Sequence, residues 1–128
     1  MHMNQSLAVI MCELHGLKKI HDSLGHPAGD KYICDAAEIL VSCFDDQNVY
    51  RVGGDEFIIV LQGITKADLT IRTDRLQLYA DLKKISLSFG VSYRTNSKEH
   101  FETLLREADK KMYVQKKHYY ENLSLSRE

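Results

Sequence analysis

Two adjacent glycines in the middle of the chain separate two short apolar segments. Residues 48–52 precede Gly53 and Gly54, and residues 57–61 follow them, with the aromatic and β-branched side chains typical of strands. Two strands joined by a Gly-Gly turn form a tight antiparallel hairpin. The middle of the chain is therefore predicted to contribute two neighbouring antiparallel strands to a sheet.

The remaining segments carry the patterns of two more strands and several helices. Residues 7–12 form a continuous apolar run expected for a strand buried on both faces, and residues 85–92 alternate like a strand with one packed face. Helices are predicted over residues 17–24, 30–44, 65–84 and from residue 101 onward, with Pro27 in a loop. This order predicts an α+β fold with a ferredoxin-like core, in which helices surround a central, mostly antiparallel sheet.

Length and composition exclude several classes of protein. A chain of 128 residues argues for a single domain over residues 1–128, with residues 1–5 as a cloning remnant or linker and 119–128 as a C-terminal tail. The net charge of −1 gives no global positive field for nucleic acid or an anionic membrane. No apolar run approaches the ~20 residues that span a bilayer. We therefore expect a cytoplasmic domain, cut from a larger protein, without nucleic acid or direct membrane contact.

Cysteine and histidine residues permit two interpretations. Three cysteines stand among apolar neighbours without metal-type spacing, which predicts reduced core thiols: Cys12, Cys34 and Cys43. The alternative is a transition-metal site, although its spacings do not match the usual zinc patterns; its ligands would be Cys12, His15, His21 and His26.

Acidic residues stand at the ends of two predicted strands. Glu13 ends the first apolar run, and Asp55 and Glu56 follow the glycine pair. Carboxylates at the ends of adjacent strands can hold Mg²⁺, which takes one or two of them and leaves room for phosphates. Two such ions can activate an attacking hydroxyl and stabilise the leaving oxygen in phosphoryl transfer. The sequence therefore indicates a cation and phosphate site, against the alternative that these acids simply face water.

Four segments resemble the GGDEF family of diguanylate cyclases. Residues 53–57 contain all five signature letters on the predicted hairpin, and residues 18–30 resemble the family's F-K-x-I-N-D-x-x-G-H-x-x-G-D segment. Residues 88–91 and 108–116 resemble its S-x-G-[VI] strand and its A-D-x-A-[LM]-Y-x-A-K helix. The resemblance covers about residues 7–116. It implies the GGDEF nucleotidyl-cyclase fold and an enzyme that condenses two GTP into cyclic di-GMP, releasing pyrophosphate, for bacterial second-messenger signalling.

The resemblance also implies roles for individual residues. Mg²⁺, or Mn²⁺ in its place, would be held by Glu13, Asp55 and the Leu14 carbonyl. Asp55 and Glu56 would be catalytic, with Asp55 helping to deprotonate the 3′-hydroxyl that attacks the α-phosphate of a second GTP.

GTP itself would contact a second set of residues around the same strand ends. These are His15, Gly16, Leu17, Lys18, His21, Asp30, Gly54 and Lys116. The amides of residues 14–17 would face the phosphates, as helix N-termini do for anions, and Lys18 and Lys116 would bind phosphate. Asp30 would read the guanine edge, and Gly54 would let the nucleotide approach the hairpin backbone closely.

Several positions depart from the family pattern, so we expect a partly degenerate and N-terminally truncated domain. Glu13 replaces an aspartate, His21 an asparagine of guanine recognition, and Leu17 a phenylalanine. Tyr120 stands where an arginine usually reaches the phosphates. Residues 44–47 lack the R-x-x-D product-inhibition motif, and the opening D-x-L-T-G-L-x-N-R stretch has no counterpart.

Two functional readings therefore stay open. One is an active diguanylate cyclase. The other is a degenerate, non-catalytic GGDEF module that binds GTP and regulates an attached domain. In either case the family implies a transient antiparallel homodimer for catalysis and a sensory or output domain in the parent protein.

Overall fold

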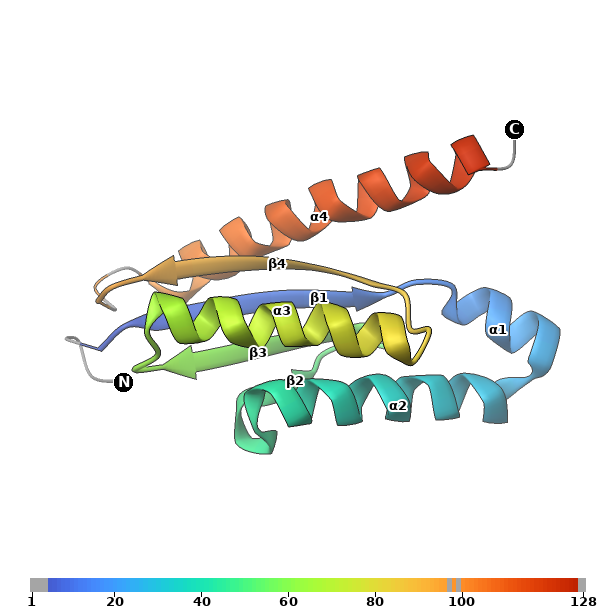
Figure 1. The fold of residues 1–128 in the computed structure, drawn as a ribbon, viewed down its shortest axis with the longest axis horizontal. Coiled ribbons are helices and arrows are strands. Elements are labelled where there is room, and N and C mark those ends of the chain that lie inside the picture. Colours follow the sequence, from blue (N-terminus) through green and yellow to red (C-terminus); the bar gives the residue numbers. More distant parts are fainter. Residues whose placement is uncertain (1–4, 97, 99, 127–128) are drawn as a thin grey trace.

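Four strands form one sheet in the order β2-β3-β1-β4, with every neighbouring pair antiparallel (Figure 1). The strands are β1 (Leu7–Leu14), β2 (Val49–Arg51), β3 (Glu56–Gln62) and β4 (Leu87–Arg94). This computed structural model describes residues 5–96, 98 and 100–126, so all but the last residue of the predicted N-terminal remnant lies outside the described part. The predicted α+β, ferredoxin-like fold is confirmed.

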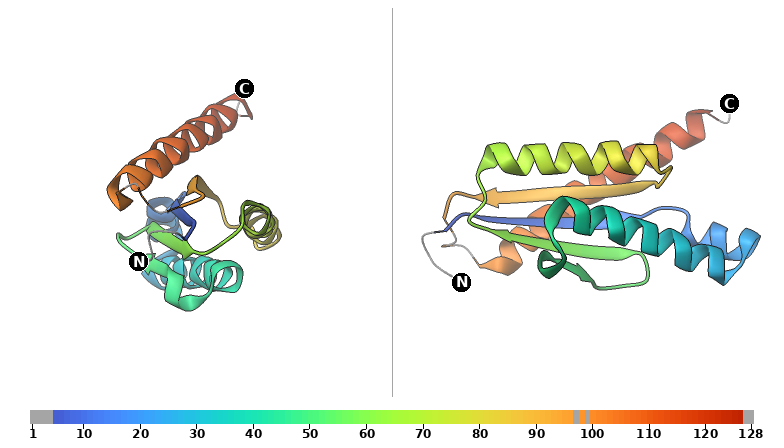
Figure 2. Two further views of the ribbon diagram at one scale, coloured as in Figure 1. Left: turned by 90° about the vertical axis from the view of Figure 1, so that its left-hand side faces the viewer. Right: turned by 60° about the horizontal axis from the view of Figure 1, so that its bottom comes forward.

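Helices cover both faces of this sheet. They are α1 (Leu17–Leu24), α2 (His26–Phe44), α3 (Lys66–Leu82) and α4 (Phe101–Ser126), with a short 3₁₀ helix, η1 (Asp46–Asn48), before β2. Figure 2 shows α2 and α3 on one face and α4 alone on the other. Helix α4 continues past the edge of the sheet, and α1 lies beyond the end of β1 (Figure 1). None of the helices in the described residues is both long and apolar enough to span a bilayer.

Alternation along β1 explains why its sequence is apolar throughout. Ala8, Ile10 and Cys12 belong to the core under α2 and α3, whereas Leu7 and Val9 pack with the α4 side chains. Because side chains alternate between the faces of a strand, Glu13 follows the second set. The face under α4 is therefore the face that carries this carboxylate.

Two local predictions were wrong. Helix α2 begins at His26 rather than at residue 30, and Pro27 lies in its first turn, where a missing N–H costs no intrahelical bond. The β2–β3 connection spans residues 52–55, and neither Gly53 nor Gly54 has a positive φ, so the tight two-residue turn is not formed. The C-terminal tail over residues 119–128 stays a prediction, and its residues 119–126 form the last turns of α4.

Helix α4 packs closely against β4 at Gly90. A Cβ atom added there would lie 2.0 Å from the Ala108 carbonyl oxygen and 2.4 Å from the Met112 nitrogen. The contact continues along the strand, where the Ser92 hydroxyl donates to the Leu104 carbonyl at 2.7 Å. Gly90 therefore sets how deeply α4 sits on the sheet.

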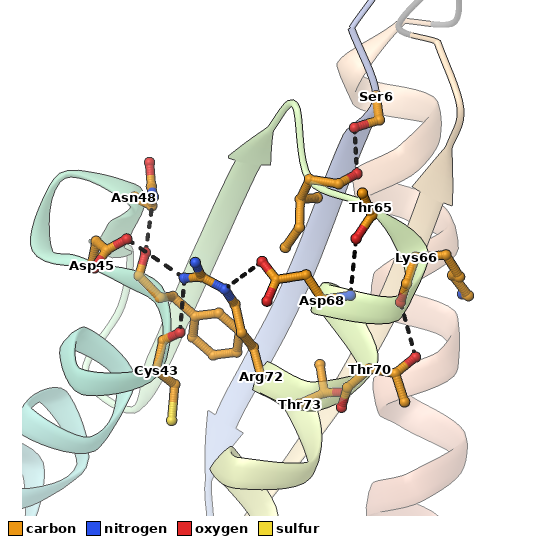
Figure 3. A network of polar contacts seen from close by, with 12 residues as sticks. Ser6, Cys43, Asp45, Asn48, Thr65, Lys66, Asp68, Thr70, Arg72 and Thr73 are labelled. Atoms are coloured by element: carbon orange, nitrogen blue, oxygen red, sulfur yellow. Dashed lines mark hydrogen bonds and ion pairs between the residues drawn. The ribbon is translucent and has the colours of Figure 1, made fainter.

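A polar network closes the end of the sheet opposite Glu13 (Figure 3). The Arg72 guanidinium donates to the Cys43 carbonyl at 3.1 Å and pairs with Asp45 at 3.5 Å and Asp68 at 3.1 Å. Arg72 and Asp45 also line an open cavity of about 470 Å³. Residues 44–47, where the R-x-x-D motif was absent, lie here, and Phe44 is fully buried in the core.

The three cysteines are free, and the structure separates them by exposure. Cys12 and Cys43 are buried as predicted, but Cys34 is exposed, so the core prediction was wrong for it. Burial raises the pKa of the Cys12 thiol to about 12 and also raises that of Cys43.

Cys34 is expected to be the one thiol of the native protein that reacts rapidly. Because the thiolate is the reactive form, one thiol should react fast with a disulfide reagent at pH 8 in the native protein, and three should react after unfolding. Cys34→Ser should remove the fast phase, and a fast phase that persists would contradict this assignment.

Candidate functional site

Strand pairing brings the predicted acidic residues together. Glu13 of β1 lies directly opposite Glu56 of β3, and Asp55 immediately precedes Glu56. One carboxylate oxygen of each of the three lies within 4.8 Å of the others, and all three residues are half-buried. Within the described residues, no other group of three such ligating side chains comes this close.

The charges in this cluster are not balanced by its own members. Burial, and then the neighbouring charges of Glu13 and Asp55, raise the pKa of the Glu56 carboxyl. Lys116 of α4 places its Nζ 3.0 Å from the Glu13 Oε1, and this hydrogen bond is the main cause that raises the pKa of Lys116. One ammonium thus faces three carboxylates. This set of close, half-buried oxygen donors fits a hard divalent cation such as Mg²⁺.

Glu56→Gln is expected to stabilise the metal-free protein. A raised pKa means that the folded state binds more protons than the unfolded state between the two pKa values, so the free energy of unfolding falls as pH rises through that window. Removing a like charge opposite Glu13 should add about 0.5 kcal/mol at pH 7. The gain should vanish by about pH 3, where Glu56 is protonated in both states.

Urea unfolding of both proteins at these two pH values, with a chelator present, measures this effect. Glu38→Gln, which changes an exposed acid in the interior of α2, is the control. An unchanged stability for Glu56→Gln at pH 7 would show that the cluster carries no repulsion.

The loop after β1 turns into α1 at Gly16, which caps the helix with φ 78°. The structure reduces the number of amides in this loop that could bind a phosphate. The Leu14 amide donates to the Asp55 carbonyl at 2.8 Å and the His15 amide to the Ser86 carbonyl at 2.9 Å, so both are already used. The first bond within the helix runs from the Ile20 amide to Gly16. The amides of residues 16–19 therefore precede the helix ladder and are those able to face an anion.

His15 is placed differently from a nucleotide contact. Its side chain is 2% exposed, and its ring stacks on Tyr119 with 4.2 Å between centroids and 5° between planes. Its Nε2 lies 2.6 Å from the Ser88 hydroxyl, and its carbonyl accepts from the Tyr32 hydroxyl at 3.1 Å. Ser88, Tyr32 and Tyr119 were missed from the sequence because they are 17 to 104 positions away and carry no motif that pairs them with His15.

The residues expected to contact the base, His21 and Asp30, lie on α1 and α2. Asp30 is exposed, and so is Lys18, which is expected to bind phosphate. The His21 ring packs against Gly29, where an added Cβ would lie 2.1 Å from the ring, and its Nε2 is buried without a hydrogen-bond partner among the described residues. At Gly54 an added Cβ would meet nothing within 4 Å. The chain itself does not require glycine there.

The structure argues against the transition-metal interpretation. Cys12 faces the core under α2 and α3, whereas His15 is enclosed by Ser88 and Tyr119 near α4. The His21 and His26 rings do lie 4.4 Å apart between centroids. Among the described residues, Cys12, His15, His21 and His26 do not form a group close enough to hold one metal ion.

Comparison with known proteins identifies relatives over most of the chain. The family model described as "Diguanylate cyclase, GGDEF domain" matches residues 1–122. Diguanylate cyclase A of Treponema denticola is 29% identical over an alignment covering 96% of this chain and 36% of the relative. The cyclic di-GMP phosphodiesterase PdeB of Shewanella oneidensis is 33% identical, over 82% of this chain and 13% of its own length.

A solved structure has the same fold. The active GGEEF domain of a diguanylate cyclase from Vibrio cholerae superposes with a TM-score of 0.74 at 28% identity, covering 89% of this chain and 78% of that one. The chain spans 36% and 13% of the length of the two curated relatives. One of those relatives is named for synthesis of cyclic di-GMP and the other for its breakdown.

Proposed function

The chain belongs to the GGDEF family of diguanylate cyclase domains, and we propose that it condenses two molecules of GTP into cyclic di-GMP with release of pyrophosphate. The observation that carries this proposal is the cluster of Glu13, Asp55 and Glu56, with Lys116 reaching Glu13 from α4. Similarity to a diguanylate cyclase over 96% of the chain supports it. In this proposal the domain serves cyclic di-GMP signalling.

The proposed reaction joins two nucleotides by two equivalent steps. In each, the 3′-hydroxyl oxygen of one GTP bonds to the α-phosphorus of the other, the bond from that phosphorus to pyrophosphate breaks, and the hydroxyl proton passes to the Asp55 carboxylate. The negative charge of Glu56 raises the proton affinity of the Asp55 carboxylate, which favours that proton transfer. Glu13, Asp55 and the Leu14 carbonyl would hold Mg²⁺, or Mn²⁺, which when bound polarises the phosphate and neutralises developing charge.

The proposed binding residues surround this cluster. The free amides of residues 16–19 and the ammonium groups of Lys18 and Lys116 suit a triphosphate. Asp30, exposed on α2, suits the amino and imino edge of guanine, with His21 beside it. Open space at Gly54 lets a nucleotide approach the hairpin backbone.

The product requires two copies of the domain. One cluster serves one GTP, and cyclic di-GMP contains two guanylyl units, so the proposal includes a transient antiparallel homodimer with one GTP held by each partner. The parent protein would bring the two together through a sensory or output domain.

A second candidate function is favoured by two observations. The His21 ring is turned against Gly29, and Tyr120 offers a half-exposed phenol where the family pattern has an arginine. Both weaken substrate contacts without removing the carboxylates. A domain of this kind would bind GTP without turnover and regulate an attached domain.

The test is incubation of concentrated protein with GTP and Mg²⁺, followed by chromatography of the nucleotides, with ATP and a chelator as controls. Cyclic di-GMP that forms from GTP alone, disappears with the chelator and rises with the square of protein concentration supports the cyclase. Absence of product together with GTP binding in equilibrium dialysis supports the regulatory module. Absence of both product and binding overturns both candidates.

A further inference from the structure

His15 joins two parts of the site that are far apart in the sequence. It lies two residues after Glu13, and its stacking partner Tyr119 lies three residues after Lys116 on α4. Tyr120 adds an edge-on contact to the same ring with 5.6 Å between centroids. The proposed mechanism assigns no task to this buried ring.

In the part of α4 that the structure describes, the helix is anchored on both sides of Lys116, which itself pairs with Glu13. Its earlier turns pack on the sheet through Leu104 and Ala108 and end in the hydrogen bond from the Phe89 amide to the Gln115 Oε1 at 2.7 Å. The C-terminal part of α4 extends past the edge of the sheet (Figure 1). The Lys116 turn is therefore held between Gln115 on one side and the aromatic stack on the other.

Hydrogen bonds hold His15, the other end of the stack. Its amide donates to the Ser86 carbonyl and its carbonyl accepts from Tyr32 of α2, so the backbone is held on both sides. The ring itself is held by Ser88 of β4, whose hydroxyl lies 2.6 Å from Nε2. The ring on which Tyr119 lies is therefore fixed to the sheet before α4 reaches it.

We propose that His15 and Tyr119 are positioning residues whose stack holds the Lys116 ammonium at the triphosphate and at Glu13. This proposal rests on the proposed function as a GTP-binding site. Tyr119 acts through Lys116 and does not touch the nucleotide. The stack thereby fixes the turn of α4 that carries Lys116, and without it that turn would be free to move away from the site.

The matched variants are Tyr119→Leu, which removes the stack, and Tyr119→Phe, which retains it. Tyr113→Leu is the control, because Tyr113 is 65% exposed on the same helix. An aromatic pair of ordinary strength predicts GTP binding about tenfold weaker in Tyr119→Leu. Tyr119→Phe and Tyr113→Leu should bind GTP like the wild type, which separates loss of the stack from general damage to α4.

Two nucleotide-free signals keep the test independent of GTP. Ring-current shifts of the His15 protons in NMR report the stack, and the Lys116 side-chain nitrogen signal reports its pairing with Glu13. Both should change in Tyr119→Leu and stay in Tyr119→Phe. Wild-type binding by a Tyr119→Leu protein whose His15 protons have shifted overturns the proposal. A wild type that binds no GTP overturns the proposed function, and an unchanged Lys116 signal in Tyr119→Leu then overturns the positioning role by itself.

Discussion

Asp55→Asn is expected to slow cyclic di-GMP formation by a factor of about 100 to 1,000, the loss typical when one preorganised electrostatic group is removed. The amide keeps the shape of the side chain but accepts no proton at neutral pH and is a weaker ligand for Mg²⁺. The Asp55 carbonyl, which accepts the Leu14 amide at 2.8 Å, is unchanged by the substitution. The expected loss is therefore in chemistry and metal binding, with the hairpin intact.

Initial rates of cyclic di-GMP formation from saturating GTP measure this effect, with thermal unfolding to verify the fold. Asp46→Asn is the control, because Asp46 is an exposed acid in η1 at the other end of the sheet. The Asp46→Asn protein should form cyclic di-GMP at the wild-type rate. An Asp55→Asn protein within a few-fold of the wild type would assign proton removal and metal binding to other groups.

The cluster of Glu13, Asp55 and Glu56 was predictable from sequence because its members lie at strand ends. A run of apolar residues ending in Glu13, and glycines followed by Asp55 and Glu56, define strands whose antiparallel pairing leaves little freedom. In the structure Glu13 and Glu56 are direct cross-strand partners. The motif and the register of the strands place the same three acids together, so local sequence patterns suffice to predict the cluster.

The details that were not predicted from sequence have two causes, a local side-chain contact at the hairpin and a long-range ring contact at His15. Gly53 and Gly54 suggested a two-residue turn, but the Arg51 guanidinium donates to both of their carbonyls, at 3.1 and 2.8 Å, and supports a longer connection. His15 was expected at the phosphates because its position in the motif is local. Its neighbour Tyr119 comes from the far end of the chain, and no spacing in the sequence indicates that the two rings meet.

The second large effect is expected in stability, from Gly90→Ala. Its new methyl group would overlap the backbone of α4 at Ala108 and Met112, and backbone atoms cannot rotate away as a side chain can. Helix α4 must then move outward from the sheet, opening gaps around Leu104. Overpacking of this kind should lower the free energy of unfolding by about 3 kcal/mol. Because α4 also carries Lys116, GTP binding should weaken in the same variant.

Gly54→Ala is expected to have the opposite outcome to Gly90→Ala, with stability nearly unchanged and GTP binding weakened. Nothing lies within 4 Å of an added Cβ at Gly54, and its φ is not positive, so stability should change by less than about 0.5 kcal/mol. GTP binding should still weaken severalfold if the nucleotide approaches the hairpin there. Urea unfolding and equilibrium dialysis of both variants measure the two effects separately. A stable Gly90→Ala protein would contradict the close seating of α4, whereas a Gly54→Ala protein with wild-type affinity would place the nucleotide away from the hairpin.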